Sequence, residues 1–214
     1  MTVNDANGTQ YFDSAPTVAS KRREIELVLP DAYLELTTDT GVFSSGGVDK
    51  GTRYLLRAMP DLDTLPAPPG AVLDLGCGYG PIALTMAQRL PSGHIWGVDV
   101  NERALDLAKE NAAANGITNV SFGKAPELDS TQTFDLIVSN PPIRIGKHAL
   151  HDLLTVWLDR LNPGGRAWMV VQKHLGSDSL ATWLTAQGWV TTRINSKAGF
   201  RILETFARSH QEQE

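Results

Sequence analysis

The stretch VLDLGCGYG, residues 72–80, constrains the fold of this chain more than any other feature. The stretch begins with an apolar run suited to a strand that is buried on both faces. Pro81, the residue after Gly80, suits the first turn of a helix. Three glycines separate these two parts, so the backbone can turn sharply there and a ligand can approach it closely. The stretch therefore predicts a buried strand, a ligand-binding loop and a helix in succession.

Strands and helices alternate from Ala71 onward. The patterns predict strands at 71–76, 94–100, 120–125, 134–139 and 166–172, helices at 81–90, 101–116, 148–161 and 179–188, and a terminal hairpin of strands 189–195 and 200–208. Alternation of this kind is typical of a parallel sheet with helices on both faces. We therefore expect a doubly wound α/β fold. The terminal hairpin should add an antiparallel strand at one edge, so that the sheet is mixed.

The first sixty residues follow a different pattern. EIELVLP and AYLELTTD, residues 24–30 and 32–39, alternate apolar and polar positions and predict a β-hairpin. A flexible start at 1–15, a glycine-rich loop at 41–52, a short helix at 53–59 and a proline-rich connector at 60–70 complete this part. We expect an N-terminal extension, 1–60, packed on a catalytic domain, 61–214.

The bulk properties set limits on location and partners. The chain has 214 residues, a length that suits a single α/β domain, and 42% of them are apolar. It lacks an apolar run long enough for a membrane helix, and its one cysteine cannot form an internal disulfide, which points to the cytoplasm. A net charge of −5 argues against a protein that coats nucleic acid, but it leaves room for a local basic patch.

The glycine loop and two acidic residues predict the ligand. The glycines Gly76, Gly78 and Gly80 are spaced G-x-G-x-G, whereas the dinucleotide fingerprint is G-x-G-x-x-G. Asp74 suits a ligand that carries a positive charge, and Asp99, at the end of the next strand, can accept hydrogen bonds from ribose hydroxyls. These features predict an adenosine ligand with a charged amino-acid end, a description that S-adenosylmethionine fits. We interpret Cys77 as a small packing residue.

A second motif ends the strand at 134–139. There the chain reads SNPPI, so that Asn140 is followed directly by Pro141 and Pro142. Alone, such a sequence is a strand-terminating turn. After a glycine loop in the same α/β unit, it indicates a site that holds one amide and one carbonyl rigidly.

The two motifs together resemble the class I S-adenosylmethionine-dependent methyltransferases. DLGCGYG with the following VDV is similar to their cofactor motifs, and NPPI resembles the (N/D/S)-P-P-(aromatic) motif of the branch that methylates planar nitrogens. The resemblance implies that Asn140 and Pro141 are catalytic. The Asn140 side-chain oxygen and the Pro141 carbonyl would each accept one N–H, so that the lone pair of the amine points at the methyl group.

A longer resemblance covers roughly residues 10–208. The segments at 41–56, 140–154, 161–173 and 199–203 are similar to the small-domain (MTS) family, and within it to single-domain members of the RsmC-like group of ribosomal RNA guanine-N2 methyltransferases. This resemblance implies a strand order of 3-2-1-4-5-7-6. It also implies methylation of the exocyclic N2 amine of a guanine in small-subunit ribosomal RNA, with the target base unpaired or flipped out.

The resemblance and the residue pattern together suggest roles for individual positions. No metal is expected. The residues expected to bind the cofactor are Asp74, Gly76, Cys77, Gly78, Gly80, Asp99, Val100, Asn140, Phe43, Gly51 and Thr52. The residues expected to bind the substrate are Pro142, Ile143, Arg144, Lys147, Phe43 and Ser44.

The chain departs from the family pattern in three ways. Ile143 stands where an aromatic ring usually stacks on the base, and Phe43 is a candidate to replace it. The acid that meets the adenine amino group is not evident, which leaves the backbone of Lys124 or Ala125, or the Glu127 side chain. The additional RNA-binding domain of two-domain members does not fit in this length. The partner is then ribosomal RNA or an assembled small subunit, approached by a monomer or a homodimer.

Three other functions remain open. The same chemistry serves a protein glutamine amide or the amine of a small molecule, and the acidic net charge favours this choice. A non-catalytic cofactor-binding module is a second alternative, although the intact Asn140, Pro141 and Asp74 oppose it. A dinucleotide-binding oxidoreductase is the third, and the glycine spacing opposes it.

Overall fold

The computed structural model describes residues 18–65 and 67–208, so the expected flexibility of 1–15 lies outside the described part. An antiparallel hairpin of β1 (Arg23–Val28) and β2 (Tyr33–Thr38) forms a separate two-stranded sheet. The backbone N–H of Leu29 donates to the carbonyl of Ala32 and closes its turn, 2.9 Å away. The predicted N-terminal hairpin is thereby confirmed.

Helix α1 (Lys50–Ala58) begins inside the segment that the sequence predicts to be a loop. Its start is set by Asp49, whose carboxylate accepts hydrogen bonds from the backbone N–H groups of Gly51 and Thr52. Such an N-cap satisfies donors that otherwise lack partners in the first helical turn. The loop prediction is therefore wrong for the last residues of 41–52. A 3-10 turn, η2 (Leu62–Thr64), lies in the proline-rich connector.

The main sheet has seven strands, in the order β5-β4-β3-β6-β7-β9-β8. They are β3 (Ala71–Leu75), β4 (His94–Val98), β5 (Val120–Gly123), β6 (Phe134–Ser139), β7 (Leu161–Gln172), β8 (Thr191–Lys197) and β9 (Phe200–Phe206). Counted from β3, this is the predicted order 3-2-1-4-5-7-6. Strands β3 to β7 pair in parallel, and β9 is antiparallel to both β7 and β8. The antiparallel strand therefore lies one place in from the edge, not at it.

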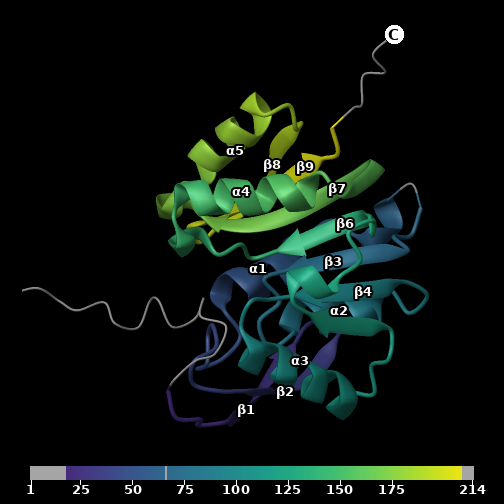
Figure 1. The fold of residues 1–214 in the computed structure, drawn as a ribbon, viewed down its shortest axis with the longest axis vertical. Helices are drawn as coiled ribbons and strands as arrows, with labels where there is room; N and C mark the ends of the chain where they lie inside the picture. Colours follow the sequence, from purple (N-terminus) through teal and green to yellow (C-terminus); the bar gives the residue numbers. More distant parts are fainter. Residues whose placement is uncertain (1–17, 66, 209–214) are drawn as a thin grey trace, which may run out of the picture.

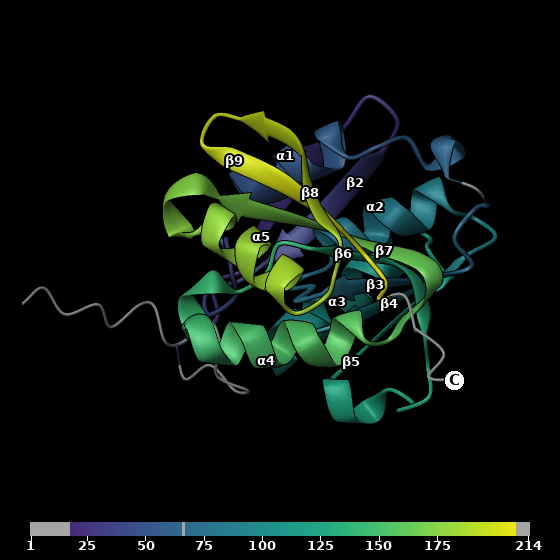
Figure 2. The same ribbon diagram turned by 90° about the horizontal axis from the view of Figure 1, so that it is seen from above.

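Helices cover both faces of this sheet (Figures 1 and 2). The helices of the core are α2 (Pro81–Arg89), α3 (Glu102–Ala114), α4 (Lys147–Leu158) and α5 (Ser177–Ala186), with 3-10 turns η3 (Ala125–Glu127), η4 (Ile143–Ile145) and η5 (Lys173–Leu175). One hydrophobic cluster joins the hairpin, α1, α2 and α3 to the sheet, and a second joins α4 and α5 to its other face. The doubly wound α/β prediction is confirmed.

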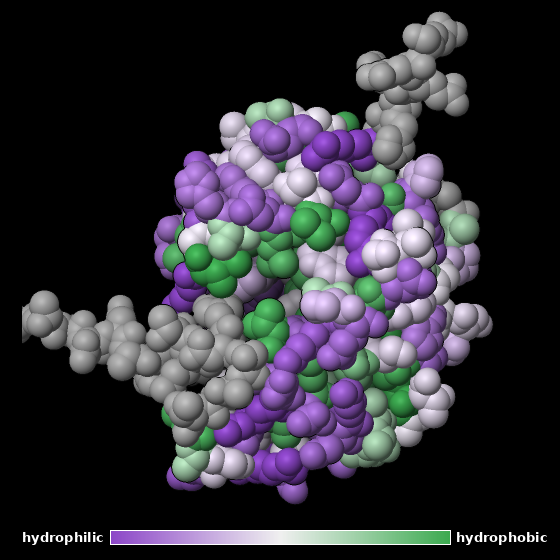
Figure 3. Space-filling model, viewed as in Figure 1, coloured by the Kyte–Doolittle hydropathy of each residue, from purple (hydrophilic) through white to green (hydrophobic). Residues whose placement is uncertain are grey.

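In helix α3, the spacing of the apolar residues determines which face of the helix packs against the protein. Its Leu105, Leu107 and Ala108 are buried, while Asp106 and Lys109 are exposed. In Figure 3 the surface over this helix is accordingly hydrophilic. An apolar stripe at helical spacing buries one face and leaves the charged face to solvent.

Strand β7 is longer than predicted. It begins at Leu161, so the NPGG sequence at 162–165, which precedes the predicted strand 166–172, lies within the strand. The register against β6 shifts between the pairs Phe134–Leu161 and Leu136–Arg166, and Gly164 has a φ of 78°. A glycine in this conformation accommodates an irregularity in the strand.

The parallel register brings the predicted motifs together. Leu75, the last residue of β3, pairs with Val98 of β4 on one side and with Ser139 of β6 on the other. The glycine loop that follows β3 therefore lies between Asp99 and Asn140. In open α/β sheets, ligands bind at this carboxyl edge. Within the described ranges, none of the helices is long and apolar enough to span a membrane.

Candidate active site

The glycine loop uses backbone conformations that favour glycine. Gly76, Gly78 and Gly80 have φ values of 76°, 55° and 96°, in the left-handed region. The N–H groups of Gly76 and Cys77 both donate to the carbonyl of Val98, at 2.9 and 3.0 Å. A Cβ added at Gly78 would meet no atom within 4 Å, so the backbone there is open to a ligand.

Asp99 supports this loop from the end of β4. Its Oδ2 accepts from the N–H of Gly78 at 2.8 Å and its Oδ1 from the N–H of Asn101 at 2.9 Å. Burial raises the pKa of its carboxyl. The next residue, Val100, is 53% exposed and presents an apolar surface beside the carboxylate. Contacts of Asp99 with a ribose and of Val100 with the cofactor remain predictions.

Asp74 lies in β3, directly before the glycine loop. Its side chain is fully buried, and its Oδ2 accepts from the N–H of Ala83, in the first turn of α2, at 2.8 Å. Its Oδ1 has no hydrogen-bond partner among the described residues, and burial raises the pKa of the carboxyl to about 8. The carboxyl group thus anchors α2 beneath the glycine loop, and its contact with the cofactor's charged end remains a prediction.

A small pocket lies at the carboxyl edge of the sheet. It brings together the predicted residues Phe43, Ser44, Thr52, Gly76, Cys77, Gly78 and Asn140, and adds Asp49, Tyr79, Pro81 and Ile82, to which the sequence assigned no role. The predicted residues that do not line it are Gly51, Asp74, Gly80, Asp99, Val100, Pro141, Pro142, Ile143, Arg144 and Lys147. The pocket therefore joins the loop before α1, the glycine loop, the start of α2 and the end of β6.

Asn140 is held by two residues from the segment at 41–56. Its Nδ2 donates to Oδ2 of Asp49 at 2.9 Å and to Oγ1 of Thr52 at 3.1 Å. A carboxylate only accepts hydrogen bonds, so the amide nitrogen must face Asp49 and the amide oxygen must face away from it. None of the described residues donates to this oxygen, Oδ1, which leaves it free to accept. Asp49 belongs to the D-x-G-T sequence at 49–52, which was the available signal for its role.

The two prolines connect Asn140 to its surroundings. Pro141 is buried, and its carbonyl accepts from the N–H of Ile143 at 2.8 Å. A carbonyl has two lone pairs, so one acceptor position of Pro141 remains. A Cβ added at Gly76 would lie 3.9 Å from Cδ of Pro142, which places the Asn-Pro-Pro turn against the glycine loop. The two predicted motifs therefore form a single site.

The residues after the prolines point in different directions. Ile143 is half-buried and packs against the hydrophobic cluster of α4 and α5, whereas Arg144 and Lys147 are exposed. The first turn of α4, which starts at Lys147, contains no acidic residue. The N-terminus of a helix carries a partial positive charge, so these two cations add to a positive field beside Asn140.

The segment after β5 was predicted to meet the adenine amino group. Oε2 of Glu127 accepts from the N–H of Lys124 at 3.1 Å, and the Lys124 ammonium forms an ion pair with Glu102. Both side chains already have partners within the protein. The choice among Glu127 and the backbone of Lys124 or Ala125 stays open.

A doubly wound sheet with an antiparallel seventh strand, a glycine loop between an aspartate and an Asn-Pro-Pro turn, and a pocket over that loop define a class of enzymes. This class is the S-adenosylmethionine-dependent methyltransferases. The chain fits the cofactor: the backbone at Gly78 is open to a ligand, and Tyr79, which lines the same pocket, has a buried hydroxyl that lacks a partner among the described residues. Among these residues there is also no group of three or more His, Cys, Asp or Glu that could hold a metal ion.

Comparison with known proteins gives the family. The sequence model described as "Methyltransferase small domain" matches residues 33–204. The chain belongs to the methyltransferase small domain family, and its cofactor is S-adenosylmethionine.

Two curated relatives and one solved structure illustrate this relationship. "Uncharacterized protein YbxB" of Bacillus subtilis is 36% identical over 197 residues, which cover 91% of this chain and 96% of YbxB. "Ribosomal RNA small subunit methyltransferase C" of Pseudomonas entomophila is 34% identical over 169 residues, 77% of this chain and 49% of the relative. The chain thus spans about half the length of that relative.

The solved structure is the 16S rRNA N2 methyltransferase RsmC of T. thermophilus in complex with AdoMet and guanosine. It matches with a TM-score of 0.75 and 24% identity, over 90% of this chain and 52% of that one. At this identity the likeness establishes the fold.

Proposed function

We propose that this enzyme methylates the exocyclic N2 amine of a guanine in small-subunit ribosomal RNA, in the cytoplasm. The observation that carries the proposal is the orientation of Asn140, whose amide nitrogen is bound to Asp49, 2.9 Å away, so that its oxygen is left as an acceptor. An acceptor of this kind suits an amine that has hydrogens to donate. The relatives named for ribosomal RNA methylation support the choice of substrate.

The chemistry follows from the weakness of the nucleophile. The lone pair of a guanine amine is delocalised into the ring, so the nitrogen is planar. Oδ1 of Asn140 and the free lone pair of the Pro141 carbonyl would each accept one of its hydrogens and favour a pyramidal nitrogen. When bound, S-adenosylmethionine supplies a methyl group on a positively charged sulfur, and that sulfur keeps the electron pair as the new N–C bond forms. The surplus proton on nitrogen then leaves to water.

Asp49 and Thr52 prepare this arrangement before the substrate arrives. Asp49 accepts from Gly51 at 2.7 Å and from Thr52 at 3.1 Å as well as from Asn140, so its carboxylate is fixed by α1. An acceptor that needs no rearrangement during the reaction contributes more to catalysis than a mobile one.

The target base reaches this site from the open side of the pocket. Phe43, which lines the pocket and is 48% exposed, would offer its ring to a flipped guanine in place of the aromatic residue that Ile143 replaces. Arg144 and Lys147 would meet the RNA phosphates. The extension at 1–60 supplies Phe43, Asp49 and Thr52 to the catalytic domain at 61–214, and on this proposal it covers the cofactor.

A glutamine amide of a protein is the second candidate. It is also a planar nitrogen with two hydrogens, and it does not need an aromatic residue at position 143. The aliphatic Ile143, half-buried against the hydrophobic cluster of α4 and α5, favours this candidate.

The test is methyl transfer from tritium-labelled S-adenosylmethionine. The purified enzyme is incubated with ribosomal particles from cells that lack its gene, with naked ribosomal RNA and with bulk protein, and Asn140→Ala serves as the control. We expect label in small-subunit RNA, recovered as N2-methylguanosine after digestion and lost with the variant. Label confined to protein would move the same chemistry to the glutamine candidate. Cofactor binding without label in any substrate would contradict both candidates.

A further inference from the structure

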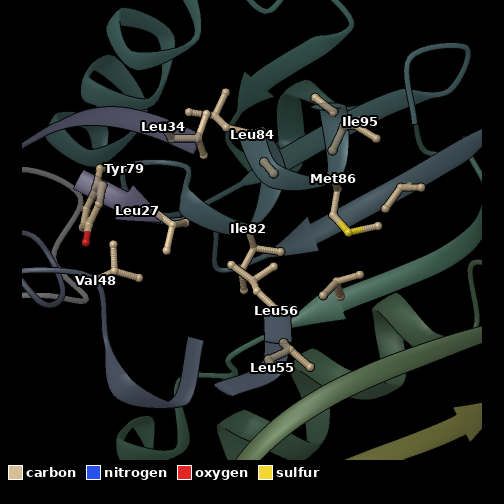
Figure 4. Packing of buried hydrophobic residues seen from close by; sticks show 14 of the residues in the cluster. Leu27, Leu34, Val48, Leu55, Leu56, Tyr79, Ile82, Leu84, Met86 and Ile95 are labelled. Atoms are coloured by element: carbon tan, nitrogen blue, oxygen red, sulfur yellow. The ribbon is translucent and has the colours of Figure 1, made fainter. Parts of the chain in front are cut away.

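Tyr79 lies in the glycine loop, between Gly78 and Gly80. The residue is only 2% exposed, yet its hydroxyl has no hydrogen-bond partner among the described residues. Figure 4 shows its hydroxyl directed toward Val48, which belongs to the same hydrophobic cluster. Buried hydroxyls are normally hydrogen-bonded, so a phenol without a partner requires an explanation.

Two charged side chains, Asp49 and Arg53, influence the Tyr79 hydroxyl. Tyr79 lines the pocket together with Asp49, the residue after Val48. Arg53 is held nearby, since its Nε donates to the carbonyl of Val48 at 3.4 Å and its Nη2 to that of Glu26 at 3.1 Å. Burial raises the pKa of the Tyr79 hydroxyl, the positive charge of Arg53 lowers it and the negative charge of Asp49 raises it. The hydroxyl therefore stays protonated at neutral pH and is available as a donor.

The position of Asn140 decides which part of the cofactor meets this donor. The methyl group must reach the amine held by Asn140, so the sulfur and the amino-acid end of S-adenosylmethionine lie on the same side of the glycine loop as Asp49 and Asn140. The ribose and adenine then lie toward Asp99, which follows β4 at the other flank of the loop. The amino-acid end carries one ammonium and one carboxylate. The Asp49 carboxylate suits the ammonium, and an O–H donor near Arg53 suits the carboxylate.

We propose that the Tyr79 hydroxyl donates a hydrogen bond to the α-carboxylate of S-adenosylmethionine and that Arg53 adds a favourable positive charge to this contact. Tyr79 is then a cofactor-binding residue that selects ligands with an intact amino-acid end. The inference rests on the cofactor and on the proposed role of Asn140 in holding the target amine. It stands or falls independently of whether the methylated substrate is RNA or protein.

The experiment compares two ligands on two proteins by isothermal titration calorimetry. S-adenosylhomocysteine carries the α-carboxylate, and decarboxylated S-adenosylmethionine lacks it. For Tyr79→Phe we expect the dissociation constant for S-adenosylhomocysteine to rise roughly 10- to 100-fold, the range for one hydrogen bond to a charged group. The dissociation constant for the decarboxylated ligand, measured by competition where binding is weak, should not change.

Folding controls keep the test decisive. Because the hydroxyl has no partner in the free protein, Tyr79→Phe should melt at the wild-type temperature or above it without ligand. Tyr33→Phe is the matched control, since that hydroxyl is exposed and contacts Glu26 and Glu35 on the hairpin. Unchanged binding of S-adenosylhomocysteine by Tyr79→Phe would overturn the proposal. An equal loss for both ligands would also overturn it, because the hydroxyl would then not act on the carboxylate.

Discussion

The carboxylate of Asp49 lies 2.9 Å from the side-chain nitrogen of Asn140, although 91 positions separate the two residues in the chain. The same oxygen caps helix α1 through the N–H groups of Gly51 and Thr52. One carboxylate therefore ties the start of a helix to the end of β6. Since it accepts hydrogen bonds and cannot donate them, it also determines which atom of the Asn140 amide is free for a substrate.

Removing this carboxylate while keeping the helix cap should slow catalysis. Asp49→Ser retains a good N-cap residue, but a serine is too short to hold Asn140. We expect kcat to fall about 10- to 100-fold, because the amide can then rotate and present its N–H groups to the amine. Binding of S-adenosylhomocysteine should weaken as well, because the same carboxylate suits its ammonium, so kcat is measured at saturating S-adenosylmethionine.

The control for this prediction is Asp61→Ser. Asp61 also caps a short helix, through the N–H of Asp63, and it does not line the pocket. Steady-state kinetics of both variants separates the two roles. If Asp49→Ser kept the wild-type kcat, the orientation of Asn140 would not depend on Asp49.

The stability of the unliganded protein should depend on pH through Asp74. Its pKa is raised to about 8 by burial, far above that of an unfolded aspartate. The native state thus keeps a proton that the unfolded state loses above about pH 4, so this group lowers the free energy of unfolding as pH rises from about 4 to 8, by at most about 1.4 kcal/mol per pH unit. Asp74→Asn removes the titration. Urea unfolding at pH 5 and pH 8 should show the variant gaining stability relative to wild type at the higher pH, and a constant difference would refute the assignment.

Gly97 lies beneath the glycine loop and leaves no room for a side chain. An added Cβ would lie 2.5 Å from Cδ1 of Phe122 and 3.2 Å from Cβ of Cys77. Gly97→Ala should therefore cost about 1–3 kcal/mol of stability and weaken cofactor binding by displacing Cys77. Gly46→Ala is the comparison, because an added Cβ there meets no atom within 4 Å. Thermal denaturation of both variants tests this, and equal melting temperatures would contradict it.

The salt dependence of RNA binding tests the proposed partner. Arg144 and Lys147 are exposed next to the Asn-Pro-Pro turn, and neither forms an ion pair within the described ranges. If they contact phosphates, Arg144→Gln and Lys147→Gln should each reduce the slope of log K against log salt by roughly 1. Lys109→Gln, on the exposed face of α3, should leave the slope unchanged. Equal slopes for all three variants would place the RNA elsewhere.

Much of the fold follows from the sequence because its signals are local. Apolar runs separated by glycine and proline identify the strands and helices from Ala71 onward, and their alternation requires a parallel sheet. Residues that follow parallel strands must meet at one edge, so the glycine loop, Asp99 and Asn140 could be grouped without coordinates. The order of the strands in the sheet cannot be read from local sequence patterns, and its prediction came from the resemblance to a known family.

The direction of each side chain was decided by the tertiary structure. Asp74 precedes the glycine loop in sequence, yet α2 packs over it and turns its carboxylate into the protein. Asp49 looked like part of a loop, yet the packing of α1 brings it to Asn140. Tyr79 is one position from the open backbone of Gly78, yet its side chain is buried and its hydroxyl lacks a partner among the described residues. Periodicity assigns a residue to an element, whereas contacts between distant segments determine which atoms face the ligand, and only the folded chain contains those contacts.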